Sequence, residues 1–177
     1  MVSPARRASG TATVEAVRAV AETVPDPELP PLTLADLGVL RSVAVDPGSG
    51  AVTVTITPTY SGCPALEAMR ADLVARLGAA GHDDVRVHVA LSPAWTTDWI
   101  TDEGRRKLAE AGVAPPGRVG ARPGGPVPLA LEPVRRRVAC PRCGGDSVEL
   151  SHFGSTPCKS LRRCVSCDDP FEHVKEL

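Results

Sequence analysis

Apolar residues alternate with polar ones in two stretches of the first hundred residues, which is the period of a β-strand. Val52, Val54 and Ile56 are separated by threonines, and apolar residues recur at every second position from Val85 to Leu91. β-branched residues in alternation are typical of a strand with one buried face. A third apolar run precedes a glycine-containing loop, which predicts a hairpin with the strand that follows it. The predicted strands are residues 40–45, 52–57 and 85–91.

Between and around these strands the apolar spacing lengthens to three or four residues, which is the period of an α-helix. Leu66, Met69, Leu73 and Leu77 share one face of such a helix, and Pro64 suits its first turn. The predicted helices are residues 11–23, 64–78 and 102–111. Together these elements predict an α+β fold in which helices cover a small three-stranded sheet.

The pattern changes beyond Gly112. Residues 113–137 are rich in proline and glycine and have no apolar period, so they predict a linker that cannot bury enough surface to fold alone. Cysteines then gather near the end of the chain. The sequence therefore predicts an α+β domain at residues 11–112, a linker at 113–137 and a small cysteine module at 138–177.

Four of the six cysteines form two C-x2-C pairs, with twenty residues between the pairs. They are Cys140 and Cys143, followed by Cys164 and Cys167. Each pair points two thiolates at one place, and two pairs complete a tetrahedral site of four sulfurs for zinc or, alternatively, iron. Such a site is coordinatively closed, which predicts a structural, zinc-ribbon-like module. Two disulfides or an uncoordinated thiol cluster are the alternatives, and Cys158 is either a spare thiol or a replacement for one of the four ligands.

Charge and hydropathy limit the partners and the compartment. The net charge of −1 gives no global attraction to nucleic acid or to a membrane. Residues 1–112 carry ten Lys/Arg and fourteen Asp/Glu, giving −4, and residues 113–177 carry ten and seven, giving +3. No stretch reaches 18 consecutive apolar residues, and no secretory signal pattern is present. The sequence therefore predicts a cytoplasmic protein with reduced cysteines.

Cys63 is a separate candidate for function. It lies between a predicted strand and a predicted helix, where unpaired N–H groups and the helix dipole favour a thiolate. A thiolate there can act as a nucleophile, a redox centre or a transient metal ligand. The alternative is a small apolar residue in a tight turn, with a pKa raised by burial. Asp26 and Glu28 lie in a proline-rich loop and are candidates for a supporting role, with a solvated turn as the alternative.

Several motifs resemble those of iron–sulfur assembly factors related to SufT. These motifs are Asp26-Pro-Glu-Leu-Pro30, Asp36-Leu-Gly-Val-Leu40 and Thr57-Pro-Thr-Tyr-Ser-Gly-Cys-Pro64. The stretch Ser92-Pro-Ala-Trp-Thr-Thr-Asp-Trp99 narrows the resemblance to the PaaD family, accessory proteins of the phenylacetyl-CoA epoxidase system. The tail agrees through Cys140-Pro-Arg-Cys143, Phe153-Gly-Ser-Thr-Pro-Cys-Lys159 and Pro170-Phe171. The resemblance covers residues 14–112 and 138–175.

The resemblance implies that Cys63 handles iron or an iron–sulfur cluster. It also implies an accessory protein, not an enzyme, that matures either the iron–sulfur reductase or the di-iron oxygenase subunit of the epoxidase. A lone thiolate cannot hold a cluster tightly, so thiols of the client or of a second copy in a homodimer would share it. The chain has no G-x-G-x-x-G or P-loop motif of a nucleotide cofactor site.

Two other hypotheses remain open from the sequence. In the first, the protein is a direct structural or electron-transfer subunit of the oxygenase complex, with iron in the four-cysteine site. In the second, it is a nucleic-acid-binding zinc ribbon, a hypothesis motivated by the Arg135–Arg137 run and by Arg162 and Arg163. The near-neutral net charge argues against nucleic acid as a partner.

Overall fold

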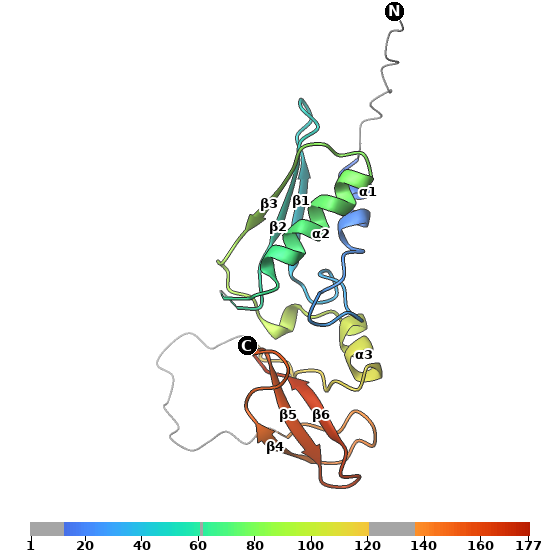
Figure 1. Cartoon of the computed structure of the whole chain (residues 1–177), viewed down its shortest axis with the longest axis vertical. Helices are drawn as coiled ribbons and strands as arrows, with labels where there is room; N and C mark the ends of the chain where they lie inside the picture. The colour runs from blue at the N-terminus through green and yellow to red at the C-terminus, as the bar shows by residue number, and fades with distance from the viewer. Residues whose placement is uncertain (1–12, 61, 121–136) are drawn as a thin grey trace, which may run out of the picture.

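Two separate three-stranded sheets organise the computed structural model, which describes residues 13–60, 62–120 and 137–177 (Figure 1). The predicted helix start at residues 11–12 and residues 121–136 of the predicted linker, including Arg135 and Arg136, lie outside the described residues. Ser61 of the third motif also lies outside them.

The first sheet belongs to the helical part of the chain. Its elements are α1 (Val14–Ala21), β1 (Leu40–Val45), β2 (Val52–Ile56), α2 (Leu66–Ala79), β3 (Val85–Val89), the short 3-10 helix η1 (Thr97–Trp99) and α3 (Asp102–Glu110). β1 and β2 form the predicted antiparallel hairpin. β3 pairs with β2 in parallel, because the chain returns through α2 before β3 begins. α1 and α2 lie on the same face of this sheet (Figure 1).

The core lies between the two helices and the central strand. Val52, Val54 and Ile56 are completely buried, whereas Thr53 on the opposite face of β2 is exposed. Leu73 and Leu77 of α2 are also completely buried. The valines of β3 are only half-buried, since β3 is an edge strand. The prediction of an α+β fold with a helix-covered sheet is confirmed.

The start of α2 differs from the prediction. The helix begins at Leu66, and no side chain caps it, so Pro64 lies in the turn before the helix rather than in its first turn. The Cys63 N–H donates to the Tyr60 carbonyl at 3.2 Å, and the Leu66 N–H donates to the Cys63 carbonyl at 3.3 Å. These hydrogen bonds come before the first turn of α2, so Cys63 lies three residues before the first helical residue, Leu66.

The second sheet forms a ribbon at the end of the chain. Its strands are β4 (Ser147–Ser151), β5 (Lys159–Cys164) and β6 (Pro170–Val174). β5 is central and antiparallel to both neighbours. Two cysteine-containing turns precede β4 and follow β5, so both lie at the same end of the ribbon. The ribbon lies below α3 in Figure 1.

Residues 113–120 attach the ribbon to the first domain. The Ala114 N–H donates to the Glu172 carbonyl at 2.8 Å, and the Val174 N–H donates to the Ala114 carbonyl at 3.1 Å. The Leu177 carbonyl oxygen accepts the N–H of Thr97 at 3.2 Å. Val174 is buried in the apolar core of the first domain. This part of the predicted linker is therefore paired to β6. Within the described residues, no helix has the length and apolarity to cross a bilayer.

Gly38 occupies a position that tolerates no side chain. Its φ of +69° is in the left-handed region, and an added Cβ would lie 2.6 Å from Cβ of Trp99. Gly81 also has a positive φ, +95°, but an added Cβ would meet open space. A side chain at Gly38 would therefore meet both backbone strain and steric overlap, whereas one at Gly81 would meet backbone strain alone.

We expect Gly38→Ala to destabilise the fold by about 3 kcal/mol and Gly81→Ala by about 1 kcal/mol, because only the first adds overlap to left-handed strain. Urea unfolding monitored by tryptophan fluorescence measures both values. Equal losses for the two variants would contradict the close approach of Gly38 to Trp99.

Candidate functional site

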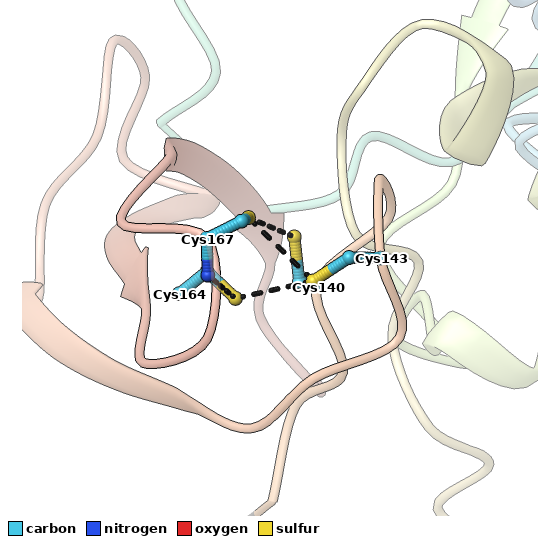
Figure 2. Close-up of side chains that lie close together, drawn as sticks. All are labelled: Cys140, Cys143, Cys164 and Cys167. Atoms are coloured by element: carbon cyan, nitrogen blue, oxygen red, sulfur yellow. Dashed lines mark hydrogen bonds between the residues drawn. The ribbon is translucent and has the colours of Figure 1, made fainter.

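The four cysteines of the C-x2-C pairs converge on one point. Their sulfurs all lie within 4.8 Å of one another. Cys143 Sγ lies 3.4 Å from Cys164 Sγ and 3.5 Å from Cys167 Sγ, and Cys140 Sγ lies 3.9 Å from Cys167 Sγ (Figure 2). A tetrahedral ion with bonds of about 2.3 Å places its sulfurs about 3.8 Å apart. The spacing therefore fits one tetrahedral metal ion held by four sulfurs.

The two cysteine turns have the same backbone design. The Cys140 N–H donates to the Gly145 carbonyl at 2.8 Å, and the Cys164 N–H donates to the Asp169 carbonyl at 3.0 Å. The residue after the second cysteine of each pair is left-handed, with φ of +73° at Gly144 and +62° at Asp168. Each turn thus closes over its two sulfurs in the same way, which explains why two short motifs suffice to build the site.

The local electrostatics favour a cation among these sulfurs. The N–H groups of Cys167 and Ser166 point at Cys164 Sγ and lower its pKa to about 6. N–H groups of Gly145 and Asp169 also act to lower the pKa of Cys143 and Cys167, but the neighbouring thiols outweigh them and raise both. A divalent ion offsets the repulsion between neighbouring thiolates, because it stabilises all four of them at once.

Cys158 lies away from this cluster. It immediately precedes β5, whereas Cys164 ends that strand, so the two lie about 20 Å apart along the extended chain. Cys158 is buried, and its sulfur contacts Thr156 Oγ1 at 3.1 Å. The arrangement does not support Cys158 as a replacement ligand in the four-cysteine site. His173 lies on β6 beside Ser160, at 3.4 Å between Nδ1 and Oγ, and His152 is exposed.

Cys63 is buried in the turn before α2, with 8% of its surface exposed. Burial raises the pKa of its thiol, and the charges of Glu28 and Asp26 and the thiol of Cys158 raise it further, against one N–H from Ala65. The predicted stabilisation of a thiolate by the helix start is therefore wrong. The reason is that α2 begins three residues later, while burial and two nearby carboxylates disfavour a second negative charge.

Asp26 and Glu28 do not form a solvated turn. Asp26 is 4% exposed, and its carboxylate accepts the N–H groups of Glu28 at 2.9 Å and Leu29 at 2.8 Å. Burial nevertheless raises the pKa of Asp26, and burial together with Asp26 raises the pKa of half-buried Glu28. The loop is thus closed by Asp26, and the charge of Glu28 raises the pKa of Cys63.

The junction between domain and ribbon contains two residues that the sequence did not single out together with Cys63. Cys158 lies just before β5 and Lys159 is its first residue, and the Lys159 charge offsets part of the rise in the pKa of both Asp26 and Glu28. Lys159 is 4% exposed and pairs with Glu172 at 2.8 Å. A lysine that follows a cysteine predicts no particular site from the sequence. The effect of Lys159 on Asp26 and Glu28 therefore becomes apparent only in the folded structure.

Both parts of the chain match known protein families. Residues 125–175 match the PaaD zinc β-ribbon domain, and residues 14–89 match the iron–sulfur cluster assembly protein family. The chain is 42% identical over 163 residues to the Escherichia coli (strain K12) protein named as a subunit of a "Putative 1,2-phenylacetyl-CoA epoxidase", and the match spans 92% of each chain. The chain belongs to the PaaD family.

Other relatives of this PaaD-family protein match its first domain. It is 32% identical over 97 residues to the "Fe-S protein maturation auxiliary factor" of Porphyromonas gingivalis, covering 54% of this chain and 90% of that protein. The crystal structure of a DUF59 domain from Bacillus anthracis superposes with a TM-score of 0.50 and 25% identity, covering 54% of this chain and 90% of that chain. The α+β domain thus occurs alone in other proteins, and here it is combined with a zinc ribbon.

We expect Cys164→Ser to lose the ribbon metal and to unfold the ribbon, because metal binding supplies on the order of 10 kcal/mol to so small a module. Cys158→Ser is the matched control in the same strand region and should keep one metal equivalent. Elemental analysis of the purified variants, with amide hydrogen exchange of residues 138–175, measures both effects. A full metal equivalent in Cys164→Ser would contradict the four-sulfur site.

We expect Glu28→Gln to speed the alkylation of Cys63 at neutral pH. Removing the carboxylate charge lowers the thiol pKa, so a larger fraction of Cys63 is thiolate, the form that reacts. Glu67→Gln, on the exposed surface of α2, is the control and should leave the rate unchanged. Mass spectrometry of the Cys63 peptide after timed iodoacetamide treatment gives the rates, and an equal rate in wild type and Glu28→Gln would contradict the electrostatic coupling.

Proposed function

We propose that this protein is an accessory factor that delivers iron or an iron–sulfur cluster to a component of the phenylacetyl-CoA epoxidase, acting in the cytoplasm by protein–protein contact. The relative that spans nearly the whole chain bears the name of an epoxidase subunit, and the relative of the first domain bears that of an iron–sulfur maturation factor. Both names are accounted for if the first domain handles the cargo for the epoxidase.

The observation that carries the proposal is the contrast between two thiol sites. The four ribbon sulfurs are coordinatively complete for one ion, so a metal there is retained and serves the fold. Zinc fits this role. Cys63 stands apart from them among groups that attract a cation, namely the carboxylates of Glu28 and Asp26. A site with few protein ligands leaves coordination positions for exchange, which is what delivery requires.

The raised pKa of Cys63 is compatible with transient binding. A protonated, buried thiol is protected from oxidation and alkylation when no metal is present. It loses its proton when iron binds, because the bound cation stabilises the thiolate. Cys63 therefore becomes a thiolate only when it binds a metal, and it is not a permanently ionised nucleophile.

A direct structural or electron-transfer subunit is the second candidate. The N–H groups of Ser166 and Cys167 contact Cys164 Sγ at 3.4 and 3.5 Å, and hydrogen bonds of this kind to sulfur tune the potential of an iron site. A coloured, reversibly reducible iron in the purified protein would favour this candidate. A colourless protein with one zinc would favour delivery.

The test of delivery is the metal content of each epoxidase component purified from wild-type and Cys63→Ser cells. Ser is nearly isosteric with Cys, so the variant should fold and keep its ribbon metal. We expect epoxidase activity to fall and one component to lack its iron or its cluster. Arg86→Ala, on the exposed face of β3, is the control for expression and should leave every component loaded.

The same comparison can contradict the proposal. Full metal in every component, with normal turnover in Cys63→Ser cells, would exclude a delivery role for Cys63. Fully loaded components that turn over only when this protein is added back would identify a direct subunit instead.

A further inference from the structure

The four ribbon cysteines divide into two that are buried and two that are exposed. Cys140 and Cys164, the first cysteine of each pair, are 2% and 1% exposed. Cys143 and Cys167, the second cysteine of each pair, are both exposed. The sulfurs of these two lie 3.5 Å apart and come from different turns (Figure 2). One side of the metal site is therefore accessible to solvent, and the two sulfurs on that side are close to each other.

The buried side of the metal site packs against the segment that docks the ribbon. Cys140 and Cys164 share an apolar cluster with Val138, Phe171 and Ala114. Ala114 is 1% exposed, and its N–H and carbonyl groups make the two main-chain hydrogen bonds to β6. The order of the four-cysteine site is thus coupled by packing to the contact that holds the ribbon on the first domain.

The six cysteines of the chain differ in their reactivity toward an oxidant. A metal-bound cysteine is a thiolate, the form that attacks a peroxide. Cys63 and Cys158 lie outside the four-cysteine cluster, and burial raises the pKa of both thiols, so they are protonated and slow to react. Of the four ligand thiolates, Cys143 and Cys167 are the exposed ones. Ionisation and accessibility therefore select the same two sulfurs.

We propose that Cys143 and Cys167 form an oxidation site for hydrogen peroxide, at which a disulfide between them releases the ribbon metal and undocks the ribbon. The thiolate of one cysteine attacks a peroxide oxygen, the O–O bond breaks, and hydroxide leaves a sulfenic acid behind. The second thiolate attacks that sulfur, the S–S bond forms, and a second hydroxide leaves. The two thiolates together lose two electrons, and one peroxide is reduced to two hydroxides, which take up protons from water.

Disulfide formation removes two of the four metal ligands. The two sulfurs have to approach from 3.5 Å to about 2 Å, and Cys140 and Cys164 alone do not complete a tetrahedral site. Because metal binding supplies most of the folding free energy of so small a module, the strands of the ribbon and the Ala114 contact should lose their order together. This inference goes beyond the proposed function and applies to both candidate functions, since it concerns the ribbon.

Peroxide titration of the full-length, zinc-loaded protein tests the oxidation site. We expect one equivalent of hydrogen peroxide to release one equivalent of zinc, measured with a chromogenic chelator. Mass spectrometry of the digested protein should find one disulfide, between the peptides of Cys143 and Cys167. Dithiothreitol with added zinc should restore the bound metal. The double variant with Cys63→Ser and Cys158→Ser is the matched control and should release its zinc with the same stoichiometry.

Three results of the titration would each overturn the proposal. A first disulfide within one turn, or one that includes Cys63 or Cys158, would assign the oxidation to another pair. A disulfide between Cys143 and Cys167 in a protein that keeps its zinc would exclude the release of the metal. Retained zinc and fully reduced cysteines after a large excess of peroxide would show that there is no oxidation site.

Amide hydrogen exchange tests the consequence for docking. The Ala114 N–H donates to the Glu172 carbonyl at 2.8 Å, so this amide should be protected in the zinc-loaded protein and should lose its protection after oxidation. The amides of the central strand β2 are the control for the first domain and should stay protected. Unchanged protection of Ala114 in a protein that carries the disulfide and has lost its zinc would refute the coupling between oxidation and docking.

Discussion

The docking of the ribbon on the first domain is the constraint on which the functional region depends. Two main-chain hydrogen bonds link Ala114 to β6, and Val174 is buried in the core of the domain. This contact fixes β6 and the rest of the ribbon against the first domain. Without it the domain and the ribbon would be two small folds joined by a proline-rich segment.

Metal binding and the docking of the ribbon are connected, because both depend on the order of the three ribbon strands. The ribbon is too small to supply a large apolar core, and its order depends on the ion that Cys140, Cys143, Cys164 and Cys167 hold. An ordered ribbon in turn presents β6 to Ala114 and buries Val174 in the core of the first domain. The four-cysteine cluster thus supports the contact between the ribbon and the first domain.

Most of the fold could be predicted from local patterns. The alternation around Val54 gave the central strand, and the spacing of the C-x2-C pairs gave the metal ligands, because each signal is contained in a short segment. The direction of the Cys63 pKa shift could not be decided from the sequence, because the burial of its thiol and the charge of Glu28 depend on other segments. Both raise the pKa, whereas a helix start lowers it. The docking of the ribbon depends on tertiary contacts of Ala114 and Thr97 with β6 and Leu177, for which no local pattern exists.

The central claim is that the metal-ordered ribbon docks on the first domain through β6. The most direct measurement is the amide hydrogen exchange of Ala114 and Thr97, whose N–H groups donate to the ribbon, before and after a chelator removes the ribbon metal, with tryptophan fluorescence reporting that the first domain remains folded. We predict slow exchange at both amides in the metal-loaded protein and a marked increase after metal removal. An unchanged rate in a protein that has lost its metal and its ribbon structure would contradict the account.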